Sequence, residues 1–258
     1  GAAGNKGRDG AGILWDVELM NIKVITNSGL GNLALLTDAI YYAVDNGADV
    51  INMSLVGDSL PGGLTSAVQY AYDNGVVVVA AAGNNKTSLN QVPLYPVCLD
   101  ANSSQNQVLG VNAIQSDRML AIFSNFGSDC IDITAPGVFI SSTVRFSPKH
   151  GLADRYTGGW SGTSFAAPFV SGAAALVKAV QPFWSPSQIF EAITTNISKT
   201  PPDDEAAYTN LFGAGLVQIG KAVAYAAEQK KDAPTIPQMP ADIGGTVFTL
   251  NRTGVLGT

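Results

Sequence analysis

The feature that most constrains the fold is an apolar run, VVVVAA at residues 76–81, which has no polar face. A strand with one face in water alternates apolar and polar residues, whereas a strand buried on both faces reads as a continuous apolar run. Burial on both faces is typical of a parallel sheet that helices cover on both sides. The run therefore predicts an α/β protein.

Strands and helices alternate along the rest of the chain. Apolar segments predict further strands over residues 17–25, 50–54, 108–114 and 131–135. Apolar residues at helical spacing, with capping residues at the ends, predict helices over residues 33–46, 63–74, 163–180 and 185–197. This alternation predicts a doubly wound, mostly parallel sheet flanked by helices, joined by right-handed crossovers.

Composition narrows the class and the partners. The 258 residues are 46% hydrophobic and 13% charged, which excludes disorder for most of the chain. A net charge of −6 argues against a nucleic-acid partner, and no apolar run reaches the roughly 18 residues of a membrane span, so no membrane partner is expected. Low charge with 28 glycines and 13 prolines favours a compact, secreted enzyme.

The composition changes near residue 229, where two lysines are followed by Pro234, Pro237 and Pro240. We expect one domain over residues 1–228 and a Pro-rich linker or tail over residues 229–258. The alternative is that the apolar stretch 246–250 packs on the core as an extra strand.

Two polar residues stand where a parallel sheet places its reactive groups, at the carboxyl ends of strands. Asn84 follows the buried run, and Ser164 lies at the start of the helix expected over residues 163–180. The free backbone N–H groups and the positive dipole of a helix start stabilise an oxyanion. Taken alone, however, the Gly-Thr-Ser segment favours a serine that merely caps a buried helix.

The wider context favours a nucleophile. GTSFAAPFVSGAAAL resembles the nucleophile segment of the subtilisin-like serine proteases, VVVVAAAGN resembles their oxyanion-asparagine segment, and GADVINMSL resembles the strand and loop of their substrate cleft. Further matches follow in the family's order: FSNFG at 123–127, ITAPG at 133–137 and GAGLV at 213–217. The resemblance covers roughly residues 1–225 and implies the subtilisin-like fold.

The resemblance also implies roles for particular residues. Ser164 corresponds to the nucleophile, and Asn84 works with the Ser164 backbone N–H as the oxyanion hole. The implied reaction is endopeptidase hydrolysis of peptide or protein substrates through an acyl-enzyme. The segments implied to bind the substrate backbone, together with Gly83, are Ser28, Gly29, Leu30 and Gly31 on one side and Ser54, Leu55 and Val56 on the other. Val56 stands where the family usually has glycine, which argues against a preference for large aromatic residues.

The family's aspartate and histidine motifs are absent from this chain. The single histidine, His150, follows Asn84 in the sequence and lies outside a His-Gly-Thr-His setting. The opening residues resemble the family stretch just after the histidine-bearing helix, so we expect the chain to be the carboxyl-terminal part of a longer subtilase. Such a chain alone is expected to show no peptidase turnover and to be poorly stable. A natural pseudoenzyme and a surrogate base from His150 are the alternatives.

Three functions compete. The first is the endopeptidase, and the second is a catalytically inactive subtilase-like domain that binds peptides. The third, a nucleotide-binding protein, is disfavoured because no Gly-x-Gly-x-x-Gly follows a strand and no Gly-Lys-Ser/Thr occurs.

No cofactor is required by the implied chemistry, although many family members bind Ca²⁺. Asn5 and Asp9 lie in a loop that can serve as one structural calcium site, while solvated loop residues are the simpler interpretation. Cys98 and Cys130 either form a disulfide in a secreted chain or remain two buried thiols. A propeptide or a missing amino-terminal segment is a possible partner.

Overall fold

The computed structural model describes residues 1, 2, 4, 10–26, 31, 33–60, 62–199 and 211–231. A six-stranded sheet lies at its centre, in the order β1-β2-β3-β4-β8-β7. All neighbours are parallel except β7 and β8, which are antiparallel. The strands are β1 (Val50–Met53), β2 (Val77–Ala81), β3 (Val108–Ile114), β4 (Ile133–Pro136), β7 (Ile197–Ser198) and β8 (Leu216–Val217). The predicted mostly parallel α/β fold is confirmed.

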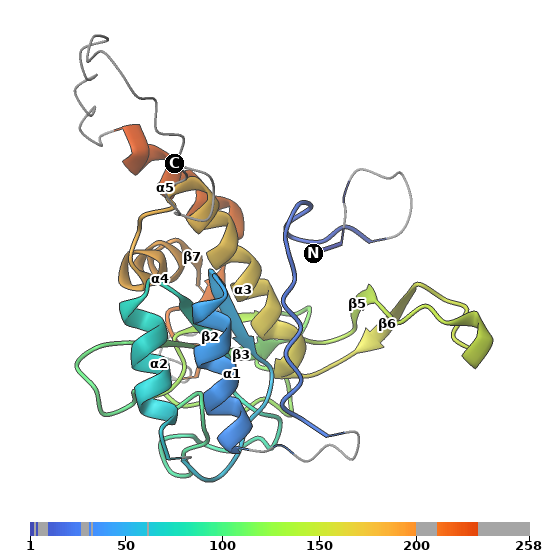
Figure 1. Cartoon of the computed structure of the whole chain (residues 1–258), viewed down its shortest axis with the longest axis horizontal. Coiled ribbons are helices and arrows are strands. Elements are labelled where there is room, and N and C mark those ends of the chain that lie inside the picture. Colours follow the sequence, from blue (N-terminus) through green and yellow to red (C-terminus); the bar gives the residue numbers. More distant parts are fainter. Residues whose placement is uncertain are drawn as a thin grey trace, which may run out of the picture.

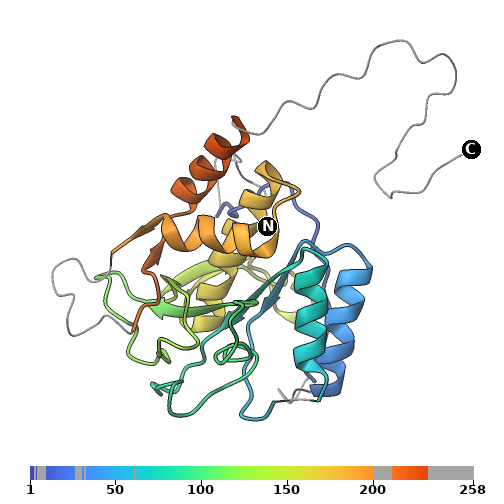
Figure 2. The same cartoon turned by 90° about the vertical axis from the view of Figure 1, so that its left-hand side faces the viewer.

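Helices lie on both sides of the sheet (Figures 1 and 2). One pair lies side by side, α1 (Leu33–Asp45) and α2 (Leu64–Asp73), and the other group is α3 (Thr163–Val180), α4 (Pro186–Thr195) and α5 (Ile219–Lys231). By length and composition α3 also qualifies as a membrane-spanning helix, and its packing across β1 to β4 accounts for that apolar composition.

Strand β2 shows why the apolar run has no polar face. Val77, Val79 and Ala81 belong to the core beneath α3, and Val78 and Ala80 belong to the core beneath α1 and α2. All five are essentially inaccessible to water. Small residues on α3, including Ala166 and Ala173, let this helix approach the sheet closely.

The strand expected over residues 17–25 is wrong. In this segment only Ile25 forms an isolated bridge, to Gly31, and no ladder follows. Leu19 is 78% exposed. An apolar pattern yields a strand only where a neighbour satisfies its backbone groups, and among the described residues β1 pairs with β2 alone.

An antiparallel hairpin that no sequence pattern predicted projects from the body of the molecule (Figure 1). Its strands are β5 (Ile140–Thr143) and β6 (Tyr156–Trp160). The 3₁₀ turn η1 (Pro148–His150) lies between its strands. Most of the hairpin is exposed, so burial imposes no alternating pattern on its sequence.

Cys98 and Cys130 form a disulfide in the structure, which decides between the two possibilities that the sequence left open. They join the core beneath α1 and α2. Residues 232–258 lie outside the described residues, and α5 extends to Lys231, so the domain boundary at 229 stays a prediction.

Candidate active site

The candidate site lies where the carboxyl ends of β1 and β2 meet the first turn of α3. Residues 54–56 follow β1, residues 83–84 follow β2, and Thr163 and Ser164 begin α3. The parallel register of β1 and β2 brings the two loops to the same edge of the sheet. Hydrogen bonds then connect both loops to α3 and define the site.

Asn84 is oriented by Thr163. The Oδ1 atom of Asn84 accepts two hydrogen bonds from Thr163, at 2.9 Å from the backbone N–H and at 3.0 Å from the hydroxyl. The same hydroxyl accepts the Gly83 N–H at 3.0 Å. Two donors on one side of the carboxamide fix its oxygen there, so Nδ2 must face the other way. Asn84 is exposed, and its Nδ2 lies 3.5 Å from the position that a Cβ on Gly162 would take.

Ser164 is half-buried in the first turn of α3. Its backbone N–H is one of the first-turn donors for which a helix supplies no acceptor. Its hydroxyl donates to the backbone oxygen of Ser54 at 3.2 Å. The side chain is thus neither enclosed in the core nor in contact with a strong base.

Ser54 compensates for a proline in α3. Pro168 has no N–H, so the carbonyl of Ser164, four residues earlier, lacks its usual helical donor. The hydroxyl of Ser54 donates to that carbonyl at 2.9 Å. Asn52 Nδ2 donates to the same hydroxyl at 2.9 Å, and Asn52 Oδ1 accepts from Ser171 at 2.9 Å. These bonds tie β1 to the turn that carries Ser164.

Gly83 and Asn125 shape the loop that carries Asn84. Gly83 has φ of 95°, and a Cβ there would lie 2.6 Å from Asn125 Nδ2. The buried side chain of Asn125 accepts from the N–H groups of Asn85 and Thr87 and donates to the Ala82 carbonyl. One carboxamide therefore satisfies three backbone groups of this loop.

Three further residues of the site, Thr163, Asn125 and Asn52, were not predicted, although each lies in a segment that resembles the family. Their roles depend on hydrogen bonds between loops distant in the sequence. The available signal was a polar residue inside an otherwise apolar or tightly turning segment, such as the asparagine of FSNFG.

The expected substrate-binding residues fall into two groups. Ser54, Leu55, Val56 and Gly83 come together at the site, and a Cβ on Gly83 would lie 3.3 Å from Val56 Cγ2. Ser28, Gly29 and Leu30 lie outside the described residues, and Gly31 is exposed beside its bridge to Ile25. These assignments stay predictions.

His150 lies away from Ser164. It is exposed near the tip of the hairpin, where its Nδ1 is 2.8 Å from the Ser147 hydroxyl. The hairpin pairs Ile140 with Trp160 at its base and Ser147 with Leu152 near its tip. Eight residues of extended chain separate Trp160 from Leu152, about 25 Å. The structure thus opposes His150 as a surrogate base.

No group of three or more His, Cys, Asp or Glu side chains that could hold a metal ion occurs within the described ranges. Asn5 and Asp9 lie outside those ranges, so the calcium site stays a prediction.

Ionisable groups gather instead at the opposite edge of the sheet, where the strands begin. Asp132, just before β4, accepts the Gly110 N–H at 2.7 Å and also bonds Asn106. Burial raises the pKa of Asp132 to about 7, and the nearby carboxylate of Asp100 adds to this effect. Burial also raises the pKa of Asp100, against the hydrogen bonds that it accepts from Gln107 and Val108.

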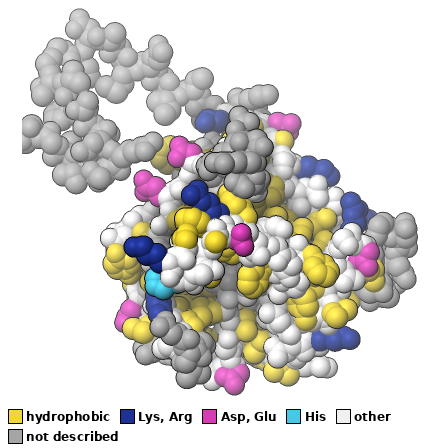
Figure 3. All heavy atoms as spheres, turned by 90° about the vertical axis from the view of Figure 1, so that its right-hand side faces the viewer, with side chains coloured by type: hydrophobic (Ala, Val, Ile, Leu, Met, Phe, Trp, Pro, Cys, Tyr) yellow, Lys and Arg dark blue, Asp and Glu magenta, His cyan; other side chains and the backbone are white. Residues whose placement is uncertain are grey.

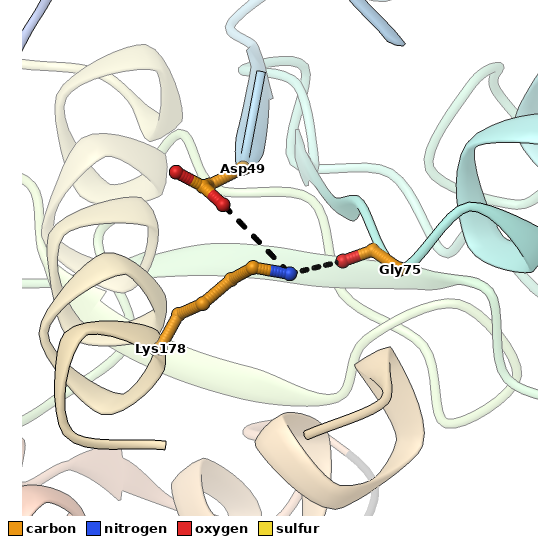
Figure 4. A network of polar contacts seen from close by, with 3 residues as sticks. All are labelled: Asp49, Gly75 and Lys178. Atoms are coloured by element: carbon orange, nitrogen blue, oxygen red, sulfur yellow. Dashed lines mark hydrogen bonds and ion pairs between the residues drawn. The ribbon is translucent and has the colours of Figure 1, made fainter. Parts of the chain in front are cut away.

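Lys178 joins three elements at this same edge (Figure 4). Its Nζ points from α3 between the chain segments that precede β1 and β2. It donates to the Gly75 carbonyl and lies 3.9 Å from Asp49 Oδ1. Burial lowers the pKa of Lys178, and the charge of Asp49 opposes that shift.

A parallel α/β sheet with its candidate site at the strand carboxyl ends defines the general class of this protein. The model of the subtilase family of peptidases matches residues 1–215. Subtilisin DY from Bacillus licheniformis is 36% identical over 212 residues, which cover 82% of this chain and 70% of that protein. Subtilisin amylosacchariticus from Bacillus subtilis subsp. amylosacchariticus is 32% identical over 215 residues, 82% of this chain and 50% of that protein.

A solved structure described as proteases from Pseudoalteromonas arctica PAMC 21717 has a TM-score of 0.68 at 29% identity. The match covers 84% of this chain and 65% of that chain. The chain spans about half the length of several of the subtilisins that it matches. It belongs to the subtilase family, as the resemblance in the sequence implied.

Proposed function

We propose that this chain carries the nucleophile and the oxyanion hole of a subtilisin-type serine endopeptidase, which cleaves peptide bonds in polypeptides. The observation that carries the proposal is the locked carboxamide of Asn84 beside the helix turn of Ser164. Thr163 holds the amide oxygen with two hydrogen bonds, which leaves Nδ2 as a preorganised donor.

In the proposed reaction the Ser164 oxygen attacks a substrate carbonyl, and negative charge develops on the carbonyl oxygen. The Ser164 N–H and Asn84 Nδ2 stabilise that oxyanion. The serine proton, taken up by an external base, passes to the leaving amine, which departs. An acyl-enzyme remains on Ser164, and water hydrolyses it to the free carboxylic acid. The backbone of residues 54–56 lines the place where the substrate backbone would add as an extended strand.

Activation of Ser164 needs a proton acceptor, and none of the described residues brings one to the site. Ser164 donates to the peptide carbonyl of Ser54, which is too weak a base to remove the proton. The chain's one histidine lies near the tip of the hairpin. We therefore expect the chain as given to be inactive as a peptidase on its own.

The proposed place of action is outside the cell. The disulfide between Cys98 and Cys130 supports this, because such bonds persist in oxidising compartments. The proposed acyl transfer uses side-chain and backbone groups and requires no cofactor.

The test is phosphonylation of Ser164 by a fluorophosphonate, with imidazole supplied as an external base. Little labelling is expected without imidazole, and labelling should rise with its concentration. Asn84→Ala should slow the imidazole-dependent reaction about a hundredfold, since removing one such donor from a subtilisin costs about a hundred- to a thousandfold in kcat.

Asn85→Ala is the matched control. Asn85 is the neighbouring exposed asparagine, and its hydrogen bonds to Asn125 and Thr87 use its backbone and not its side chain. Equal rates for the two variants would contradict the oxyanion-hole assignment. A Ser164 that stays unlabelled at every imidazole concentration would instead favour the inactive, peptide-binding domain.

A further inference from the structure

The β5–β6 hairpin adjoins the proposed nucleophile but is not explained by it. The rings of Trp160, at the base of the hairpin, and Phe165, next to Ser164, stack with centroids 5.9 Å apart. The Gly162 N–H donates to the Gly137 carbonyl at 2.8 Å, which closes the base of the hairpin against the start of α3. A polypeptide bound along the hairpin would therefore reach Ser164 at the hairpin's base.

Within the described residues, the two hairpin strands pair only with each other. Its strands form a separate two-stranded sheet, so both outer edges carry backbone groups that no other described strand pairs. Two-stranded hairpins are marginally stable in water without further packing. In this hairpin, backbone hydrogen bonds continue beyond the paired residues of β5 and β6. They join Val144 to Arg155 and Ser147 to Leu152.

The surface of the hairpin is apolar and basic. Its exposed apolar side chains are large: Phe139 is 80% exposed, Phe146 47%, Leu152 44% and Trp160 44%. Exposed apolar groups gathered on one element indicate a binding surface.

Its charge is opposite to that of the whole chain. Residues 139–160 hold Arg145, Lys149 and Arg155 against one carboxylate, Asp154, a net charge of +2, whereas the whole chain carries −6. All three basic side chains are exposed, and none forms an ion pair with a carboxylate in the described part of the chain. Arg155 Cζ lies 4.6 Å from the centroid of the Phe146 ring, which holds the guanidinium on the surface. Dark-blue basic side chains lie beside the cyan histidine in Figure 3.

We propose that this hairpin is an exosite for an acidic stretch of the polypeptide substrate. Its basic side chains would bind carboxylates, its exposed rings would pack against the substrate, and its free edges would pair with extended backbone. The acidic charge of the rest of the chain disfavours nucleic acid and anionic membranes as the occupant.

The geometry also sets where the acidic residues must lie. Arg155 directly precedes β6 and is five residues from Trp160, about 17 Å of extended chain. A substrate running beside the hairpin would place carboxylates against Arg145 and Arg155 about five to eight residues from the bond that Ser164 attacks. This inference rests on the proposed function for its location beside Ser164, but peptide binding does not require catalysis.

The test measures fluorescence anisotropy of labelled peptides with the Ser164→Ala chain, which still carries the hairpin. One peptide has an acidic block, and its partner has asparagine and glutamine in the same block. The acidic peptide should bind about tenfold more tightly at about 0.05 M salt, and most of the difference should vanish at about 0.5 M. Arg145→Gln combined with Arg155→Gln should abolish the preference.

Arg118→Gln combined with Lys221→Gln is the control, since both residues are exposed, lie outside the hairpin and give the same change in charge. Far-ultraviolet circular dichroism would confirm that each variant is folded. Equal binding of the two peptides, or equal loss of preference in both double variants, would overturn the proposal. Equally tight binding of a single-stranded oligonucleotide of matched charge would also overturn it, because the surface would then recognise charge alone.

Failure of the exosite and failure of the proposed function are distinguishable. Imidazole-dependent labelling of Ser164 without a preference for acidic peptides would refute only the exosite. A preference for acidic peptides without labelling would support the exosite and refute the nucleophile.

Discussion

The two edges of the central sheet use different polar chemistry. At the carboxyl edge, neutral groups hold Ser164: the carboxamide of Asn84 and the hydroxyls of Thr163 and Ser54. At the amino edge, Asp132 and Lys178 are partly buried, and burial shifts the pKa values of both. The ionisable groups with shifted pKa values lie at the amino edge, and the candidate site lies at the carboxyl edge. The pH dependence of the free energy of unfolding therefore arises away from the candidate site.

The largest effect on the free energy of unfolding is expected at Asp132, at the amino edge. The pKa of this carboxyl is about 7 in the native state, against 3.8 when it is exposed to water in the unfolded chain. The native state therefore binds more protons between these values, and the free energy of unfolding falls as pH rises through that window. The full loss is at most about 4 kcal/mol.

Asp132→Asn should remove most of that pH dependence, as measured by urea unfolding between pH 4 and pH 8. The exposed Asp154→Asn is the control and should leave the slope unchanged. A slope that persists in Asp132→Asn would show that the titrating group is not Asp132.

The next effect is expected at the neutral edge, at Gly83. Gly83→Ala should lower the free energy of unfolding by about 3 kcal/mol, because φ is left-handed and the new Cβ meets the buried Asn125 side chain. Gly57→Ala is the control, since a Cβ there meets nothing within 4 Å. Equal melting temperatures for the two variants would contradict the described loop geometry.

A smaller effect tests the bond between Ser54 and the carbonyl of Ser164. Ser54→Ala should cost about 1 kcal/mol, since that carbonyl loses its donor. In a Pro168→Ala background the helix supplies an N–H in its place, so the same substitution should cost less. A double-mutant cycle that gives additive effects would show that Ser54 does not replace the missing helical donor.

The smallest effect is expected at Lys178. Lys178→Met removes the bond to the Gly75 carbonyl but also removes a partly buried charge, and the ion pair to the exposed Asp49 is long. These effects offset one another, so the change should stay below about 1 kcal/mol. The exposed Lys221→Met is the control, and a loss several times larger would show that the amino edge depends on this cation.

How much the sequence could predict depended on burial. The run at residues 76–81 and the small residues of α3 were readable because both faces of β2 are covered. Residues 17–25 have a similar apolar pattern but form only the isolated bridge from Ile25 to Gly31. The absence of a neighbouring strand cannot be inferred from the segment's own sequence. The hairpin escaped prediction because an exposed two-stranded sheet puts no periodicity into its sequence.

The candidate site was likewise predictable only in part. The expected positions of Ser164 and Asn84 came from their segments, and α3 does begin at that serine's turn. The roles of Thr163 and Asn125 depend on contacts across about 80 and 40 residues of sequence. Such pairings arise only when the sheet brings its loops to one edge.

Ser164 is proposed as the attacking group, and mapping the phosphonyl adduct would show whether this serine is the one that reacts. The chain would be treated with a fluorophosphonate and imidazole, digested, and analysed by mass spectrometry for every serine. We predict a single adduct, on Ser164, that is lost when the protein is unfolded before treatment. Adducts on Ser54 or Ser161, or adducts spread over serines according to their exposure, would contradict the account.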